Sequence, residues 1–126
     1  MSFEMDISRF VNRVKDGSNR TLRKIGVAGY QIVTNLTPVD TGRAKGNWYP
    51  GLNLIDRTAT ENVGFDATRA DAEFSNVKPG DTMNISNSLP YIVQLENGSS
   101  MQAPQGMVRR TMLLLKRKIE GGAFND

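Results

Sequence analysis

The stretch Thr37–Trp48 (TPVDTGRAKGNW) most constrains how this chain of 126 residues can fold. It follows a long helical pattern. Pro38 disfavours helical backbone angles at the residue before it, so the arriving helix is predicted to end at Thr37. Turn chemistry comes next, because a carboxylate, a hydroxyl and a glycine follow one another at Asp40, Thr41 and Gly42.

Ala44 to Tyr49 is then predicted to be a strand, which Pro50-Gly51 breaks. Ala44, Gly46 and Trp48 would share one side of that strand. Two small residues beside the single tryptophan suggest a strand that a helix crosses closely.

Apolar residues recur at helical spacing over the first 36 residues, which predicts one helix from about Phe3 to Leu36. Gly17 falls on the opposite face of that helix, where it costs about 1 kcal/mol without redirecting it. The alternative is two helices with a break at Asp16-Gly17. The stripe consists of Phe3, Ile7, Phe10, Val14, Thr21, Ile25, Ala28, Ile32 and Leu36.

Four cationic residues share one flank of this predicted helix. They are Arg9, Arg13, Arg20 and Lys24. Their spacing makes a basic stripe, which is a candidate surface for DNA or for a neighbouring subunit. An ordinary solvated helix face is the alternative.

Residues 52–80 are polar and show no helical phase in their apolar residues. A structureless loop of this length is unusual in a compact domain unless it has a function. We therefore expect a long projecting hairpin or arm, with a disordered insertion as the alternative. Its acidic residues are Asp56, Glu61, Asp66, Asp71 and Glu73.

The last third of the chain predicts a strand and two helices. Thr82–Asn87 alternates as a strand with Met83 and Ile85 facing inward, and Pro90 suits the first turn of a short helix. A C-terminal helix should run from about residue 105 to Glu120 and end at Gly121-Gly122, with a loose tail.

The predicted C-terminal helix has an apolar stripe and a basic face. The stripe is Val108, Met112, Leu115 and Ile119, and the basic face is Arg109, Arg110, Lys116 and Arg117. Leu113 lies between the cations and is a candidate subunit contact. The whole chain is expected to be one α+β domain, a small antiparallel sheet with the long N-terminal helix and the C-terminal helix on one face.

Composition argues against several classes of function. The chain has no cysteine and no histidine, which removes disulfides, thiol nucleophiles and the commonest acid–base residue and metal ligand. No nucleotide-binding glycine pattern occurs, and the acids lack calcium-loop spacing. We expect a protein that is not an enzyme and has no cofactor or metal.

Charge is distributed unevenly along the chain. Residues 1–46 carry eight Lys and Arg against four Asp and Glu, residues 47–100 carry three against seven, and residues 101–126 carry five against two. Such asymmetry suits contact with DNA or the pairing of unlike surfaces between subunits. Neither a membrane span nor a signal peptide is visible in the sequence, so a protein that is cytoplasmic where it is made is expected.

Several motifs together resemble the tail-completion (neck, minor tail component) proteins of long-tailed bacteriophages. They are TPVDTGR at 37–43, Asn47-Trp48, Ile85-Ser86-Asn87, Pro90-Tyr91, LENG at 95–98 and QAPQGMVR at 102–109. The likeness covers roughly residues 20–115. The first 20 residues and the acidic segment match no motif of that family.

The resemblance implies a structural virion protein at the head–tail neck, assembled in the host cytoplasm. Relatives form a ring around the DNA channel, so we expect a homo-oligomeric ring, with a hexamer favoured and a dodecamer as the alternative. Partners would be the head-closure, tail-terminator and tail-tube proteins, with non-specific contact to double-stranded DNA. The residues carried over are structural: Pro38, Asp40, Thr41, Gly42, Trp48, Asn87, Tyr91, Gly98 and Pro104.

Two hypotheses follow for assembly. Residues 52–80 are expected to lie on an adjacent subunit or ring, so that deleting 56–76 leaves a folded domain that no longer assembles. Cations of one helix are expected to line the channel weakly. The rival functions are a tail terminator or other head–tail ring protein, a small DNA-binding regulator, and a toxin or hydrolase.

Overall fold

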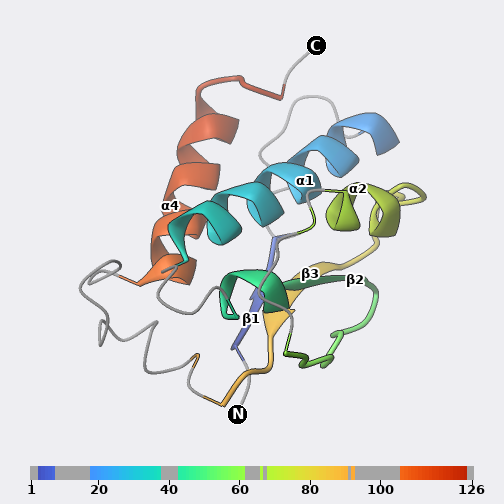
Figure 1. The fold of residues 1–126 in the computed structure, drawn as a ribbon. Coiled ribbons are helices and arrows are strands. Elements are labelled where there is room, and N and C mark those ends of the chain that lie inside the picture. The colour runs from blue at the N-terminus through green and yellow to red at the C-terminus, as the bar shows by residue number, and fades with distance from the viewer. Residues whose placement is uncertain are drawn as a thin grey trace.

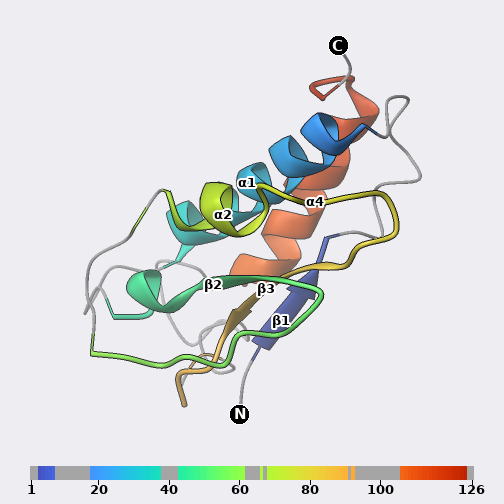
Figure 2. The same ribbon diagram turned by 90° about the vertical axis from the view of Figure 1, so that its right-hand side faces the viewer.

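The computed structural model describes residues 3–7, 18–37, 43–61, 66, 68–90, 92 and 106–124. Within these ranges the protein is α+β, with a three-stranded antiparallel sheet and three α-helices. Figure 1 shows α1 (Asn19–Leu36) crossing α4 (Met107–Glu120), and Figure 2 shows both helices and α2 (Arg69–Glu73) on one side of the sheet.

The sheet has the order β1-β3-β2, so β3 (Met83–Asn87) is its central strand. β1 (Phe3–Asp6) pairs antiparallel with one edge of β3, and β2 (Tyr49–Leu52) pairs antiparallel with the other. Met5 and Pro50 both lie opposite Ile85. The predicted strand at 82–87 is therefore confirmed, and it is the centre of the sheet.

The prediction of one helix from Phe3 to Leu36 is wrong at its beginning. Residues 3–6 are strand β1, in which Glu4 and Asp6 are exposed whereas Met5 is buried. The alternation continues to Ile7, which is fully buried. The alternating pattern of this short strand was not recognised in the sequence, because Phe3 and Ile7 also fit the four-residue spacing of a helix.

Helix α1 begins directly after Ser18, whose backbone is extended and whose hydroxyl accepts a hydrogen bond from the Thr21 amide at 3.2 Å. This N-cap sets the start of the helix because it satisfies an amide that has no partner within the helix. At the other end Thr37 has φ −75° and ψ 132°. The predicted end of the helix before Pro38 is confirmed, whereas residues 8–17 lie outside the described residues.

Helix α1 packs closely on Phe74 and on the sheet at two glycines. A Cβ added to Gly26 would lie 2.5 Å from Cδ2 of Phe74, and one added to Gly29 would lie 3.3 Å from Cδ1 of Ile7. The close crossing between helix and sheet therefore exists, but its small residues belong to α1 and not to the 44–48 segment.

The expected strand at Ala44–Tyr49 is also wrong in its bounds. Residues Lys45–Asn47 form a short 3-10 helix, and the strand is β2 at Tyr49–Leu52. Pro50, read as the end of a strand, lies inside one. It is tolerated because β2 is an edge strand, where a missing amide need not face a partner.

The described part of residues 52–80 does not form a separate projecting arm. Residues 53–60 run along the outer face of the sheet, where Asn84 Nδ2 donates to Leu54 O at 3.1 Å and Ser86 Oγ donates to Asp56 O at 2.7 Å. Because Asn84 and Ser86 alternate with Met83 and Ile85, this strip and the helices cover opposite faces of β3.

Helix α2 and the residues after it belong to the core. Ala70 and Phe74 are fully buried, and Val77 is nearly so. On α2, Glu73 Oε2 accepts the Leu52 amide at 2.9 Å, and Arg69 Nη1 donates to Trp48 O at 2.9 Å. Deleting 56–76 would therefore remove core side chains and is not expected to leave a folded domain, contrary to the expectation from the sequence.

The C-terminal helix is confirmed as α4, which ends before Gly121. Val108, Leu115 and Ile119 are buried as expected and Met112 is half-buried. The prediction of a loose tail is wrong at Phe124, which is buried and only 8% exposed. The expected short helix after Pro90 falls mostly outside the described residues, although Ile92 is fully buried.

Candidate interaction surfaces

The motif residues that the structure describes lie together in a buried corner of the fold, beneath the C-terminal end of α1. Trp48 is fully buried, and its Nε1 donates to Thr37 Oγ1 at 2.8 Å. Thr37 Oγ1 in turn donates to Val33 O at 2.6 Å. Asn87, also fully buried, donates through Nδ2 to Ala44 O at 2.9 Å. The corner therefore ties the end of α1 to the central strand.

Asn47 extends the same corner to the strip on the outer face of the sheet. Its Oδ1 accepts the Thr60 amide at 2.7 Å, and its Nδ2 donates to Arg43 O at 2.8 Å. These bonds hold the far end of residues 53–60 against the 3-10 helix. The sequence placed Asn47 in a motif but gave no sign of this partner.

Seven of the nine structural motif residues cannot be placed. Pro38, Asp40, Thr41, Gly42, Tyr91, Gly98 and Pro104 lie outside the described residues, as do Arg9 and Arg13 of the predicted basic stripe. Of these nine residues, Trp48 and Asn87 are the two with a described environment.

Helix α4 presents a basic face around one apolar side chain. Arg109 and Arg110 precede Leu113 by one turn, Lys116 and Arg117 follow it by one turn, and all five are exposed. Residues three and four apart are neighbours on a helix surface, so the four cations surround Leu113. Leu113 is 47% exposed, which confirms the arrangement predicted from the sequence.

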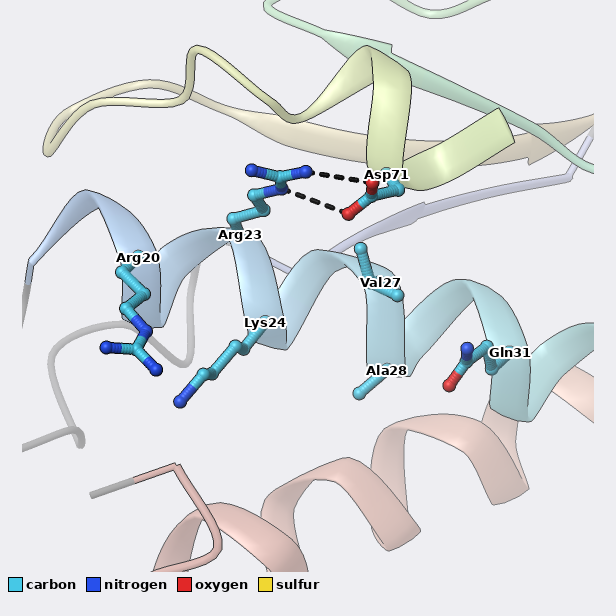
Figure 3. A pocket seen from close by; sticks show the side chains of 7 residues that line it. All are labelled: Arg20, Arg23, Lys24, Val27, Ala28, Gln31 and Asp71. Atoms are coloured by element: carbon cyan, nitrogen blue, oxygen red, sulfur yellow. Dashed lines mark hydrogen bonds and ion pairs between the residues drawn. The ribbon is translucent and has the colours of Figure 1, made fainter. Parts of the chain in front are cut away.

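Helix α1 carries a second surface, an open groove of about 330 Å³ (Figure 3). Val27 and Ala28 form its apolar floor, with Arg20 and Lys24 toward one end and Gln31 toward the other. The groove falls at the lower end of the range for ligand pockets. The prediction grouped Arg20 with Lys24, but it placed Ala28 in the core stripe and did not include Val27.

One edge of the groove is an ion pair between two elements. Arg23 Nε and Nη2 donate to Oδ1 and Oδ2 of Asp71 at 3.0 and 2.8 Å, as the dashed lines in Figure 3 show. The hydrogen bonds to Asp71, and then its charge, raise the pKa of Arg23 above its ordinary value. This bidentate pair neutralises one cation of the groove, whose other cationic lining residues are Arg20 and Lys24.

Most acidic side chains of residues 52–80 form ion pairs or hydrogen bonds within the molecule. Asp71 pairs with Arg23, Glu73 caps the Leu52 amide, and Glu61 lies 3.3 Å from Arg43. Asp66 accepts hydrogen bonds from the hydroxyl and amide of Thr68, which lower its pKa. The expectation that the whole acidic segment pairs with another subunit is therefore too broad.

Among the residues that the structure describes, no three acidic side chains come close enough to hold a metal ion. The described helices include none that is both long and apolar enough to cross a membrane.

Comparisons with known proteins identify no relative. No family model, no curated protein sequence and no solved structure matches this chain.

Proposed function

We propose that the protein is a structural subunit of the phage head–tail connector, a neck or tail-completion protein that forms a ring around the DNA channel. The observation that carries the proposal is the buried corner. Trp48 donates to Thr37, Asn47 donates to Arg43 O, and Asn87 donates to Ala44 O, which lies between these motif residues. Hydrogen bonds that hold the motif residues in one region of the fold support a structural role for the motifs.

The layout of surfaces supports assembly in a ring. Joining identical subunits head to tail requires two unlike and complementary surfaces on each copy. The protein has a basic α4 face and a partly basic α1 groove, whereas the strip 53–61 on the other side of the sheet carries Asp56 and Glu61. The ring is proposed to contain six copies, with twelve as the alternative, and to contact the head-closure and tail proteins.

The proposed channel surface is the basic face of α4. Four exposed cations along about two turns would face the phosphates of passing DNA without reading its sequence. Contact of this kind is weak at physiological salt and therefore permits DNA to slide.

Charge reversal tests the channel surface. The variant R110E/R117E should bind duplex DNA more weakly than wild type at low salt. The slope of log K against log salt should become less negative by about two, because two phosphate contacts are lost. Tight binding by the wild-type protein that resists salt, or binding that depends on DNA sequence, would favour a regulator instead.

The function itself is tested by removing the gene from its phage. Particles made without the protein should accumulate as full heads and separate tails in negative-stain images, and supplying the protein in trans should restore joined particles. Normal particles in the absence of the protein would refute the role in the connector.

A further inference from the structure

We propose that the groove on α1 receives the Leu54–Ile55–Asp56 turn of a second copy of this chain. The proposal rests on the ring function above and names the surfaces that join neighbouring subunits. The α1 groove means Arg20, Arg23, Lys24, Val27, Ala28 and Gln31 with Asp71 of α2, and the outer turn means Leu54, Ile55 and Asp56.

The outer turn exposes apolar side chains that the fold itself does not need. Leu54 is 53% exposed and Ile55 is 38% exposed, and with Leu113 they are the large exposed hydrophobic residues among those described. The backbone beneath them is fixed, since Leu54 O and Asp56 O accept hydrogen bonds from Asn84 and Ser86 of the central strand. A rigid backbone with adjacent exposed aliphatic side chains loses little entropy on docking.

The α1 groove offers matching chemistry. Its floor is the aliphatic surface of Val27 and Ala28, both half-buried, and Arg20 and Lys24 stand one to two turns before them (Figure 3). Leu54 and Ile55 would cover this floor, and the Asp56 carboxylate would then lie toward the cationic end. Arg57, the one cation beside the turn, lies 3.6 Å from Glu4 of its own chain.

The two surfaces lie on opposite sides of the molecule. The α1 residues that face the sheet, among them Ile25, Gly26, Gly29 and Val33, are buried, and the groove residues lie about half a turn away around the helix. The outer turn covers the far face of the sheet, below β3 in Figure 2. A contact between such surfaces is heterologous, so it repeats from copy to copy and closes into a ring when the rotation permits.

Protein chemistry fits this groove better than nucleic acid does. A phosphate chain would leave the aliphatic floor without an apolar partner, whereas the outer turn presents two aliphatic side chains and one carboxylate. The exposed cations of α4, which surround Leu113, offer a basic surface for DNA instead.

The absence of cysteine from the chain allows a direct test by cross-linking. Variants A28C and I55C, each with a single thiol, are mixed and treated with a short bis-maleimide, both as concentrated free protein and within particles assembled from the two variants. Products joining A28C to I55C should exceed either homodimer at least tenfold. The double variant A28C/I55C should give a ladder of multimers, and K78C, at an exposed turn residue, should give none with either partner.

Two surface substitutions provide the matched comparison. L54D and L113D each replace an exposed leucine with aspartate, so neither should change the circular dichroism spectrum or the unfolding midpoint. L54D should weaken self-association at least tenfold, and L113D should leave it unchanged.

The outcomes separate this inference from the proposed function. If particles carry the protein at the neck but the A28C–I55C product is absent from both preparations, or L113D is the substitution that abolishes assembly, the groove contact is wrong and the function stands. A28C homodimers in excess would show a symmetric contact and also overturn it. If the mixed product forms but the protein never enters particles, the contact stands and the connector function is wrong.

Discussion

At the scale of single residues, the hydrogen bond between Trp48 and Thr37 links the sequence motif to the fold. The indole N–H is buried and donates to the Thr37 hydroxyl, which itself donates to Val33 O. Burying an indole of this size stabilises a fold only if its N–H has a partner.

Replacing Thr37 with valine should therefore destabilise the protein by about 1–3 kcal/mol, because the variant keeps the shape but leaves the Trp48 N–H without its acceptor. Urea denaturation followed by tryptophan fluorescence measures the loss directly, since the chain has a single tryptophan. A59V, which introduces valine at an exposed position of the strip 53–60, should change stability by no more than about 0.5 kcal/mol. Equal effects of the two substitutions would show that the buried bond contributes little.

Predictions about single residues were correct where neighbouring residues in the sequence determine the local structure. Pro38 fixed the end of α1 at Thr37, and the positions around Leu113 gave the exposed face of α4. It failed for Arg69 and Glu73, whose partners Trp48 and Leu52 lie 21 residues away in the chain. No local pattern indicates which backbone atoms a side chain will meet after the chain has turned back.

At the scale of elements, helix α1 depends on glycine for its approach to the sheet and to Phe74. Substituting Gly26 with alanine should destabilise the fold by about 1–3 kcal/mol through overpacking, offset in part by up to about 1 kcal/mol of helix propensity. Gly29 leaves more room, so G29A should cost less than G26A in the same denaturation assay.

A double-mutant cycle identifies the contact responsible. In an F74L background the G26A penalty should shrink, because the smaller side chain vacates part of the space that the new methyl group needs. A penalty that is unchanged by F74L would place the strain elsewhere in the helix.

The turn Lys78–Asp81 joins α2 to the central strand. The hydrogen bonds of Asp81 in this turn predict that the fold loses stability in acid. The Lys78 amide, followed by the Asn53 side chain, holds the pKa of Asp81 below its ordinary value. A folded-state pKa below the unfolded value of about 3.9 means that the carboxylate stabilises the fold above that pH. This contribution is lost as the pH falls through the folded pKa.

Accordingly, D81N should be less stable than wild type at pH 7 and should lose less stability between pH 5 and pH 2. Unfolding midpoints in urea across this range measure both effects. E120Q removes an exposed carboxylate from α4 and serves as the matched control, with an expected loss similar to that of wild type. A D81N curve parallel to the wild-type curve would contradict the assigned role of Asp81.

Elements were predictable where periodicity extends over many residues. Helices α1 and α4 have long apolar stripes, and β3 alternates cleanly. β1 is four residues long, and Phe3 within it and Ile7 directly after it also fit a helical pattern. β2 contains Pro50 and Gly51, which weigh against a strand unless the strand is known to be at an edge. Edge position is a property of the sheet and cannot be read from the strand itself.

At the scale of the whole molecule, the helices and the strip 53–60 enclose the sheet from opposite sides. The α+β class was predicted correctly, but the middle segment was misjudged because its apolar residues are few. Ala70, Phe74 and Val77 are enough to fix α2 and the following turn in the core. The proposed contact with another subunit therefore uses the short outer turn and not an arm of nearly 30 residues.

The interaction surfaces could be predicted from the sequence only where they do not depend on contacts between distant segments. The basic face of α4 was visible from spacing alone. The α1 groove required knowledge that α2 brings Asp71 beside Arg23, a pairing across 48 residues. Opposite placement of the groove and the outer turn required the sheet order and register.

Locating the protein within the particle tests the central claim most directly. Phage particles carrying a tagged copy of this chain are labelled with gold-conjugated antibody and imaged by electron microscopy. The account predicts gold at the junction between head and tail, with a whole-number ring of copies, six favoured, from quantitative mass spectrometry of the same particles. Particles that are complete but contain no copy of the chain, or gold along the tail tube or over the capsid, would contradict it.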